Sequence, residues 1–522
     1  MEDGRTSGVR LAELIAALSL ATDLGLGQPQ EHVLKQTVIA TRLARLAGFS
    51  PDDQSATYYV SLMALVGCVA DSHELGRWFG DDNQIRSRSY QVDRAGMPML
   101  RFLMGNVGQG ESAATRLFLL GRFATSGIRD VAAGMSAHCQ TTGAIAQRLG
   151  LVKQVQRALP QALERWDGKG GPAHLRAKQI EPSMRAVHVA NEAEVSLRLG
   201  GLDVALEMLR NRRGSQFEPA LVDLVVNHAD ELLADIDAVD AWETVIRGCA
   251  PLDAELSESE LQQALETLAD YADLKSPWFV GHSRAAAALA VEAARLVPLS
   301  AADVQLVERA ALVSRLGGIG VSAATWDKPG PLTSIERERV RTVPYLTERI
   351  LSRQPRLAEI GAVAAMFHER MDGSGYARGL NGAAIPPPAR ILAAAEVYQA
   401  LREERPHRAA LDGAGAREVL EREAAAGRLD GPAVRAVLAA AGHRVRRRPS
   451  NVAGLSSREI EVLRLLVRGR SNREIGESLF VSRRTVSSHV EHIYNKIGVA
   501  SRGAAAMYAM QHGLIDAASP EV

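Results

Sequence analysis

A duplicated signature restricts the fold of this chain more than any other feature of its sequence. The run Glu164-Arg-Trp-Asp-Gly-Lys-Gly170 recurs 205 residues later as Glu369-Arg-Met-Asp-Gly-Ser-Gly375. The seven residues that end at Asn191 recur at the same offset in the seven that end at Glu396. A chance turn motif would not keep its spacing to a second match, so we infer that the chain contains an internal repeat.

A further match lies upstream and has a different offset. Leu46-Ala-Gly-Phe-Ser50 aligns with Leu296-Val-Pro-Leu-Ser300, which lies 250 residues further along the chain. The difference between offsets of 250 and 205 predicts 45 additional residues in the first copy. We place them in an insertion at about 70–135.

The composition indicates which elements the repeat contains. Hydrophobic residues make up 46% of the 522 residues and aromatic residues only 4%. Both copies read as helices rich in Ala and Leu, joined by Gly/Pro turns, without regular alternation of strands and helices. We therefore expect an all-α protein with one helical bundle over residues 1–240 and a second over residues 255–442.

The chain lacks the sequence marks of export and of membrane insertion. Glu2, Asp3 and Glu13 do not match the basic-then-apolar plan of a signal peptide, and no apolar run approaches the length of a membrane span. Three scattered cysteines are too few for a disulfide framework. These features predict a cytoplasmic protein that does not contact a membrane.

The charges are unevenly distributed along the chain. Overall, 61 Lys and Arg balance 61 Asp and Glu. The segment from His443 to Val522 nevertheless holds 13 basic and seven acidic residues, a net charge of +6, which leaves −6 on the preceding 442 residues. Its first part, 443–452, reads as a charged linker that contains proline. The basic segment is suited to contact with phosphates, so the neutrality of the whole chain does not exclude a nucleic-acid partner.

Four short helical patterns follow the linker. A Ser cap with a carboxylate in the first turn begins the first helix after Leu455, and Gly469 ends it. The second extends from Asn472 to Leu479, Ser482 caps the third, and the fourth covers about 502–512. A helix, a tight turn and a second helix that begins with Ser and Thr form the helix-turn-helix arrangement.

Several spaced runs in this region share one resemblance. They are Leu455-Ser-Ser-Arg-Glu459, Ser471-Asn-Arg-Glu-Ile-Gly476, Val481-Ser-Arg-Arg-Thr-Val486 and Ile493-Tyr-Asn-Lys-Ile-Gly498. In these runs residues 453–518 closely resemble the LuxR-type DNA-binding domain. The resemblance implies a four-helix domain that binds double-stranded promoter DNA as a homodimer, with its third helix in the major groove. The DNA-binding residues that it implies are Asn472, Arg483, Arg484, Thr485, Ser487, Ser488, His489, Glu491 and Lys496.

Position and chemistry suggest different roles within this set. Arg483 and Arg484 lie at the N-terminus of the third helix, where they can contact phosphates and fix the register on DNA. Ser487 and Ser488 occupy the base-facing positions that the resemblance implies. Glu491 shares that face and could accept a hydrogen bond from a cytosine amine, or it could remain solvated.

The second bundle shows a resemblance of its own over about 270–440. It is carried by Gly281-His-Ser283, Ser314-Arg-Leu-Gly-Gly-Ile-Gly320, Lys328-Pro-Gly-Pro-Leu-Thr333 and His368-Glu-Arg-Met-Asp-Gly-Ser-Gly-Tyr376. These runs resemble the HD-GYP branch of the HD phosphohydrolase superfamily. Its members fold as helical bundles, and active members hydrolyse phosphodiesters, notably cyclic dinucleotides, at a cluster of iron or manganese ions.

The metal cluster of such enzymes requires several converging His and Asp side chains. Here Ser314-Arg315 replaces the His-Asp pair that names the superfamily, Phe367 replaces the first of two adjacent His, and Val343 replaces another. The weak metal candidates that remain are His282, His368 and Glu396. We therefore expect a catalytically degenerate site with no metal or other cofactor.

Arg315 makes a metal still less favourable, because its permanent charge stands where a shared carboxylate belongs. We predict that Arg315 fills the vacated site and forms a buried ion pair with Glu396. The remnant site, which is also a candidate ligand pocket, comprises His282, Ser314, Arg315, His368, Glu369, Asp372, Gly375, Tyr376 and Glu396. Its histidines could equally be ordinary half-buried residues, and its glycine loop a structural turn.

The first copy has diverged further. Ala162 and Leu163 stand where His would be needed, and Asn191 takes the place of the last carboxylate. His138-Cys139 has no further ligand at suitable spacing, so a structural role is favoured. We likewise expect His489 in the DNA-binding region to pack or to contact phosphate and not to bind a metal.

Three functions are compatible with these features. The leading interpretation is a cytoplasmic transcription regulator in which a pseudoenzyme region senses a small molecule or nucleotide, or only dimerises, and controls a LuxR-type DNA-binding domain. The second is a metal-dependent phosphodiesterase, with iron or manganese, that carries an attached DNA-binding domain. The third is a scaffold whose large region binds other regulators. The substituted metal positions favour the first.

Overall fold

The computed structural model describes residues 8–248, 255–442 and 455–515 of the chain. It divides into two compact units, Met1–Ser257 and Glu258–Val522. Within the described ranges the regular elements are helices, and extended residues form isolated bridges only. The all-α prediction is therefore correct, whereas the predicted linker at 443–452 lies outside the described residues.

In the three described ranges, each helix is too short or too polar to extend from one side of a bilayer to the other.

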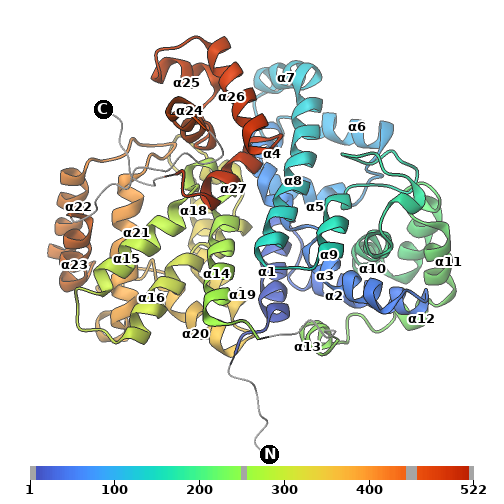
Figure 1. Cartoon of the computed structure of the whole chain (residues 1–522), viewed down its shortest axis with the longest axis horizontal. Helices are drawn as coiled ribbons and strands as arrows, with labels where there is room; N and C mark the ends of the chain where they lie inside the picture. The colour runs from blue at the N-terminus through green and yellow to red at the C-terminus, as the bar shows by residue number, and fades with distance from the viewer. Residues whose placement is uncertain (1–7, 249–254, 443–454, 516–522) are drawn as a thin grey trace, which may run out of the picture. The chain divides into compact units, whose positions relative to one another are not determined.

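The first unit is built around α2, which packs against α3 and α10. Its helices, drawn from blue to green in Figure 1, are α1 (Leu11–Gly25), α2 (His32–Leu46), α3 (Pro51–Met63), α4 (Ser72–Phe79), α5 (Asp82–Ser89), α6 (Gly96–Asn106), α7 (Ala113–Arg122), α8 (Ile128–Arg148), α9 (Lys153–Ala158), α10 (Pro182–Arg212), α11 (Pro219–Asn227), α12 (Ala229–Leu232) and α13 (Ala241–Arg247). Helix α10 is kinked at Gly201, which has a φ of 81°.

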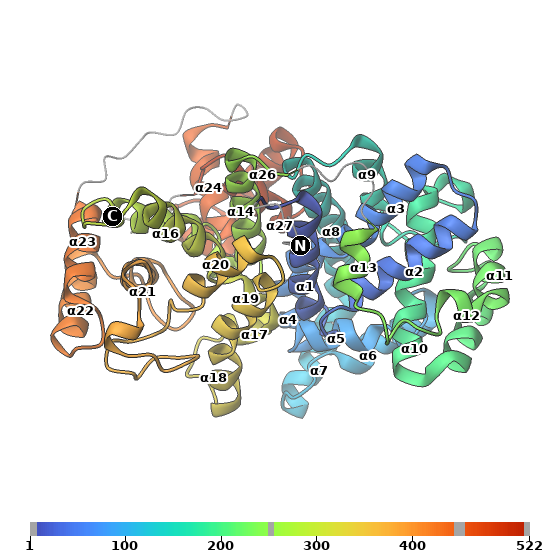
Figure 2. The same ribbon diagram turned by 90° about the horizontal axis from the view of Figure 1, so that it is seen from below.

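The second unit begins with a bundle centred on α15, which packs against α16, α21 and α23. The helices of this bundle are α14 (Glu258–Asp273), α15 (His282–Ala294), α16 (Ala301–Val313), α17 (Ala323–Trp326), α18 (Ser334–Arg341), α19 (Val343–Leu351), α20 (Pro355–Ala364), α21 (Pro387–Arg402), α22 (Gly413–Ala425) and α23 (Gly431–Gly442). Helices α21, α22 and α23 lie side by side in both ribbon views (Figures 1 and 2).

The two copies use the same local signals to form equivalent helices. The Ser50 hydroxyl caps α3 by accepting a hydrogen bond from the backbone N–H of Asp53, at 3.2 Å. Ser300 caps α16 in the same way through Asp303, at 3.1 Å. The packing also repeats, since α2 contacts α3 and α10 just as α15 contacts α16 and α21. The repeat that the sequence indicates is thus present in the local structure.

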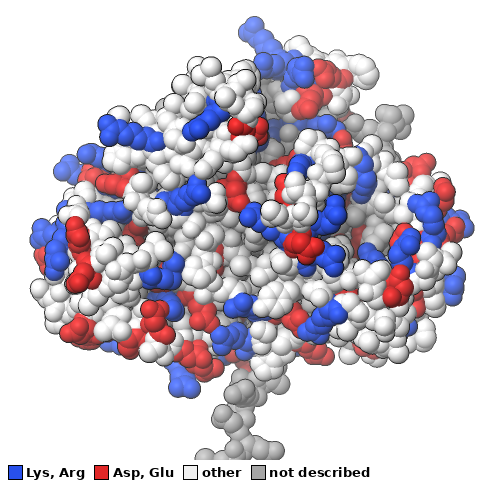
Figure 3. All heavy atoms as spheres, turned by 180° about the vertical axis from the view of Figure 1, so that it is seen from behind, with Lys and Arg blue, Asp and Glu red and all other residues white. Residues whose placement is uncertain are grey.

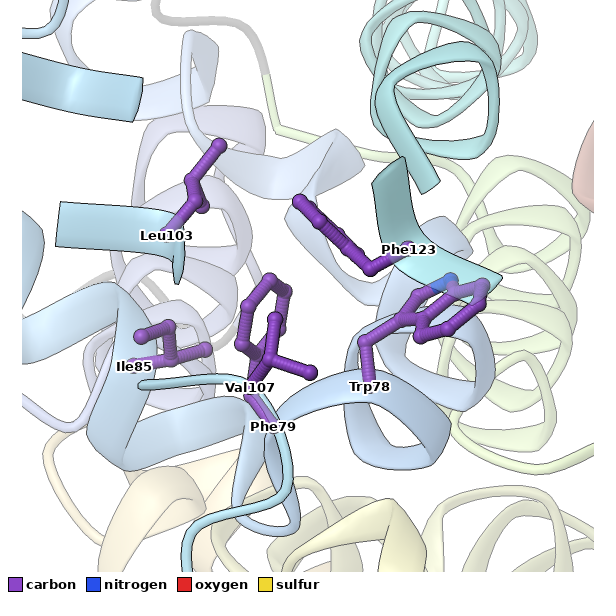
Figure 4. Close-up of a cluster of buried hydrophobic side chains, with 6 residues drawn as sticks. All are labelled: Trp78, Phe79, Ile85, Leu103, Val107 and Phe123. Atoms are coloured by element: carbon purple, nitrogen blue, oxygen red, sulfur yellow. The ribbon is translucent and has the colours of Figure 1, made fainter. Parts of the chain in front are cut away.

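Helices α4 to α7 lie within the segment where we place the additional residues of the first copy. The second copy has only the short helices α17 and α18 between the equivalent positions. Six buried side chains of the insertion pack together (Figure 4): Trp78, Phe79, Ile85, Leu103, Val107 and Phe123. Trp78 and Phe123 meet edge to face, with ring centroids 5.3 Å apart. The insertion therefore has a small hydrophobic core of its own.

The C-terminal part contains the four helices that the sequence predicts. They are α24 (Ser457–Val467), α25 (Asn472–Ser478), α26 (Arg483–Ile497) and α27 (Arg502–Gln511). Each begins after a serine whose hydroxyl accepts the backbone N–H three residues ahead: Ser456, Ser471, Ser482 and Ser501. The second and fourth helices end one residue earlier than predicted.

Candidate functional site

His282 is the centre of a buried polar cluster in the second copy. It begins α15, and its side chain is fully buried. Its Nε2 lies 2.9 Å from a carboxylate oxygen of Glu396, and its Nδ1 lies 2.6 Å from one of Glu403. Glu396 belongs to α21, and Glu403 follows that helix directly. The cluster therefore ties the start of α15 to α21.

The electrostatics of this cluster favour a protonated histidine. Burial opposes the charged form of His282, but Glu403 and Glu396 outweigh burial and raise the pKa of His282 to about 9. Burial likewise opposes the charge of Glu396, yet His282 lowers the pKa of this carboxyl to about 2. At neutral pH the cluster is an imidazolium between two carboxylates, and both ring nitrogens donate.

Two further buried residues fix this arrangement. Asp273, at the end of α14, accepts hydrogen bonds from the backbone N–H and the hydroxyl of Ser283, at 3.0 and 2.7 Å. Burial raises the pKa of Asp273 to about 7. Ser314 donates its hydroxyl to the second carboxylate oxygen of Glu396, at 3.0 Å. Both oxygens of Glu396 are therefore engaged.

Arg315 does not form the predicted ion pair with Glu396. Its guanidinium lies over the ring of Phe279, 3.9 Å from the centroid, and 5.5 Å from the ring centroid of Trp326. The prediction was wrong because His282 already neutralises the buried carboxylate, and because two aromatic rings offer the guanidinium cation–π contacts.

The loop that follows His368 is held by two of the predicted site residues. Glu369 is buried and accepts the backbone N–H groups of Arg378 and Leu380, at 2.7 and 2.8 Å. Asp372 is exposed and accepts the backbone N–H of Ser374, at 3.0 Å. These carboxylates therefore shape the loop.

Gly375 and two aromatic rings complete the loop. A Cβ atom at Gly375 would lie 2.5 Å from the backbone nitrogen of Arg370, so the chain can close here only without a side chain. The His368 ring stacks on Tyr376, with centroids 4.6 Å apart. Burial, aided by Arg370, lowers the pKa of His368 to about 3, so this imidazole is neutral.

The geometry does not fit the iron or manganese cluster that the HD-GYP resemblance implies. A ligating imidazole must present a free nitrogen, whereas both nitrogens of His282 lie at hydrogen-bond distance from carboxylates. The guanidinium of Arg315 adds a permanent positive charge nearby. Across the described ranges, no three His, Cys, Asp or Glu side chains form a group that could hold a metal ion.

The first copy holds an equivalent cluster around His32, which lies 250 residues before His282. His32 is buried, its Nε2 lies 3.2 Å from Oδ1 of Asn191, and its Nδ1 contacts Glu194. Asn191 is the counterpart of Glu396. Burial opposes the charge of His32, but Glu194 raises its pKa above the ordinary value. Both copies thus use a buried histidine to join the same pair of helices.

Several residues of these two clusters were not predicted from the sequence. Asp23 and His32 pair with Asp273 and His282 at the offset of 250, so extending the upstream match would have found them. Asp23 accepts the backbone N–H ten residues ahead, at 3.0 Å, as Asp273 does. Glu403 carried no such signal, because the position 205 residues earlier holds an arginine.

One face of α26 displays most of the predicted DNA-binding residues. Those that are exposed are Arg483, Arg484, Thr485, Ser487, Ser488, Glu491 and Lys496. Arg484, Ser488 and Glu491 share one helix face because they are four and three residues apart. Asn472 at the start of α25 donates its amide to Ser487, at 3.0 Å, while His489 is half-buried.

Lys496 has a partner inside the domain. Its ammonium donates to both carboxylate oxygens of Glu459, at 2.7 and 2.8 Å, and so ties α26 to α24. Burial opposes the charge of Glu459, but hydrogen bonds from Lys496 and Ser456 lower its pKa to about 2. This ion pair gives Lys496 a role in holding the helix-turn-helix together.

The surface charges are interspersed on the face drawn in Figure 3. Lys and Arg side chains, in blue, alternate there with Asp and Glu side chains, in red.

Two families match parts of the chain. Residues 266–432 match the HD domain, and residues 453–509 match the bacterial regulatory proteins of the luxR family. These matches confirm the resemblance to the LuxR-type domain and to the HD superfamily, while the assignment to the HD-GYP branch stays a prediction.

One known protein and one solved structure are similar to most of the chain, and another known protein is similar to a short part of it. The chain is 28% identical over 406 residues to 3'3'-cGAMP-specific phosphodiesterase 3 of Vibrio cholerae. The aligned residues make up 77% of this chain and 88% of that protein. The chain is 42% identical over 62 residues to transcriptional regulatory protein LiaR of Bacillus subtilis, which covers 12% of this chain and 29% of that protein. A crystal structure of a cyclic GMP-AMP specific phosphodiesterase of V. cholerae has a TM-score of 0.58 and 24% identity, over 84% of this chain and 99% of that one. This likeness shows a shared fold.

Proposed function

We propose that this chain, which carries an HD domain at 266–432 and a LuxR-family domain at 453–509, is a transcription regulator whose HD region does not hydrolyse phosphodiesters. The observation that carries this proposal is the engagement of both His282 nitrogens by Glu396 and Glu403. A histidine that donates at both nitrogens cannot also coordinate a metal that activates water.

In this proposal the helical region and the C-terminal domain have different roles. The helical region acts as a sensor or as a dimerisation module, and the C-terminal domain binds promoter DNA as a homodimer. Support for the second role comes from the exposed face of α26, with Arg484 at its start and Ser488 and Glu491 further along. A protein with these roles works in the cytoplasm.

The test measures metal content and hydrolysis in the full chain. Protein purified from cells supplied with iron and manganese is analysed for both metals and is incubated with manganese and 3'3'-cGAMP or a generic phosphodiester. We expect substoichiometric metal and no turnover above a Glu396→Ala variant. Stoichiometric metal, or turnover that the Glu396→Ala variant loses, would contradict the proposal.

A gain-of-function variant makes the test sharper. Ser314→His combined with Arg315→Asp returns to the chain the His-Asp pair that the HD-GYP resemblance implies. If the missing ligands are the cause of inactivity, this variant should bind more manganese than the unmodified chain under the same conditions.

One observation favours a second function, that of a metal-dependent phosphodiesterase with a DNA-binding domain. The alignment with the V. cholerae phosphodiesterase extends over 88% of that protein. Under this alternative, iron or manganese would be the cofactor, and His282 would have to release both carboxylates before it could bind the metal.

A further inference from the structure

The site in the second copy contains a guanidinium that is held without any hydrogen bond. Arg315 is half-buried and stacks on Phe279 and Trp326, with its central carbon 3.9 and 5.5 Å from the two ring centroids. Among the described residues, none forms a hydrogen bond or an ion pair with this guanidinium. Its N–H donors are therefore available to a ligand.

A second guanidinium at the site lacks a carboxylate partner. Arg370 donates only to backbone carbonyls, those of Glu369 at 2.8 Å and Phe367 at 3.5 Å. Burial is the main cause that lowers the pKa of Arg370, while the charges of Glu423, Asp372 and Glu369 act in the opposite direction without forming an ion pair with it.

The first copy provides an internal comparison for Arg370. Its counterpart, Arg165, pairs with Asp93 at 2.6 Å and with Asp167 at 3.2 Å. The residue equivalent to Asp167 is Asp372, which instead bonds to Ser374. The same arginine is thus neutralised in one copy and left without an ion pair in the other.

The ion pairs of the second-copy site leave two arginines without a carboxylate partner. Arg405 lies over the same Phe279 ring as Arg315, 4.7 Å from its centroid, and it shares Glu403 with His282. His282 pairs with Glu396 and Glu403, and Arg405 pairs with Glu403, whereas Arg315 and Arg370 have no carboxylate at ion-pair distance among the described residues. The positive charge of Arg315 also depresses the pKa values of His368 and Arg405, after the larger effect of burial. Two guanidinium groups without an ion pair in a partly buried site repel metal ions and attract an anion.

We propose that the second copy binds a phosphate-bearing ligand through Arg315 and Arg370 and holds it uncleaved, an inference that rests on the proposed function. Guanidinium groups suit this chemistry because their planar N–H donors match the oxygens of phosphate in a bidentate geometry. Arginine would then supply the positive charge that metal ions supply in an active enzyme. Inorganic phosphate and nucleotides share this chemistry.

The experiment follows thermal unfolding of the full chain in a phosphate-free buffer that contains a chelator. The probes are orthophosphate, GMP and guanosine, each at about 10 mM, since a ligand of the native state must raise the unfolding midpoint. We expect orthophosphate and GMP to raise it and guanosine to leave it unchanged. A larger shift with GMP identifies a nucleotide as the source of the phosphate, and equal shifts identify free phosphate.

Variants decide whether the binding occurs at the proposed site. Arg315→Gln removes no hydrogen bond of the free protein, so it should fold, and it should weaken binding by about tenfold or more. Arg370→Gln should also weaken binding, whereas Arg417→Gln on the exposed surface of α22 should not. The proposal is overturned if neither phosphate compound raises the midpoint, if guanosine acts as well as GMP, or if Arg315→Gln binds like the unmodified chain.

The same samples separate this inference from the proposed function. Hydrolysis of an added phosphodiester would contradict the proposed function, while the midpoint shift and its loss in Arg315→Gln would still report binding. An inert protein that also fails to bind phosphate would leave the proposed function standing and would refute the phosphate site.

Discussion

Glu164 and Glu369, which lie 205 residues apart, fasten equivalent loops with the same pair of hydrogen bonds. Each carboxylate accepts the backbone N–H groups nine and eleven residues ahead, at 2.7 and 2.9 Å for Glu164 and at 2.7 and 2.8 Å for Glu369. Both side chains are buried. Both copies therefore retain the buried carboxylate that closes this loop.

Loss of this carboxylate should destabilise either copy. Because hydrogen bonds to a charged group contribute about 1.5–3 kcal/mol each, Glu369→Ala should lower the free energy of unfolding by about 3 kcal/mol. Glu164→Ala should have a similar effect, and Glu418→Ala on exposed α22 serves as the control. Urea unfolding followed by circular dichroism measures the change. An unaltered transition in Glu369→Ala would show that the loop does not depend on this carboxylate.

The glycines of the repeated signature should tolerate no side chain. A Cβ atom would lie 2.5 Å from the backbone of Leu163 at Gly170, and 2.5 Å from the backbone of Arg370 at Gly375. We expect Gly375→Ala to cost about 1–3 kcal/mol of stability, since rigid backbone must move. Gly413→Ala is the matched control, because nothing lies within 4 Å of its added Cβ atom. Equal melting temperatures for the two variants would refute the steric argument.

Much of the fold was predictable because the sequence signals for it, such as helix caps, are local and occur in both copies. Ser50 and Ser300 cap equivalent helices, and the serine caps of α24 and α26 lie where the sequence places them. The two offsets alone predict the number of additional residues and place them between Ser50 and Glu164. Arithmetic on the repeat cannot reveal that Trp78 and Phe123 give the insertion its own core, because this contact joins residues that are distant along the chain.

The site was predicted less well because its partners are set by three-dimensional packing. The sequence predicts a pair of Glu396 with Arg315, whereas the structure joins Glu396 to His282. The actual partner of Arg315 is the face of Phe279, a contact without any sequence pattern. Glu403 was missed because the repeat does not preserve it.

The ion pair between Glu459 and Lys496 should make the C-terminal domain sensitive to acid. The pKa of Glu459 falls from 4.5 to about 2 in the folded chain, so its stabilising effect is complete above about 4.5 and is lost as the pH falls toward about 2. We expect Glu459→Gln to destabilise α24 and α26 at pH 7 and to differ less from the unmodified chain at pH 3. Hydrogen–deuterium exchange of peptides from these helices, compared between the two proteins at each pH, measures this difference. A difference that stays constant from pH 7 to pH 3 would show that the ionised carboxylate is not responsible.

Substitutions on the exposed face of α26 should change the affinity for DNA and the preference for particular bases separately. Arg484 is placed to contact phosphate, so Arg484→Ala should weaken binding to all DNA sequences and reduce the salt dependence by about one phosphate contact. Glu491 lies on the base-facing side, so Glu491→Ala should change the preferred base at one position and cost about 1–3 kcal/mol of discrimination. Binding of the full chain to a randomised duplex library, followed by titration of selected sites at two salt concentrations, measures both effects. Arg417→Ala on α22 should match the unmodified chain in both experiments. Unchanged affinity in Arg484→Ala would mean that α26 docks on DNA through a different face.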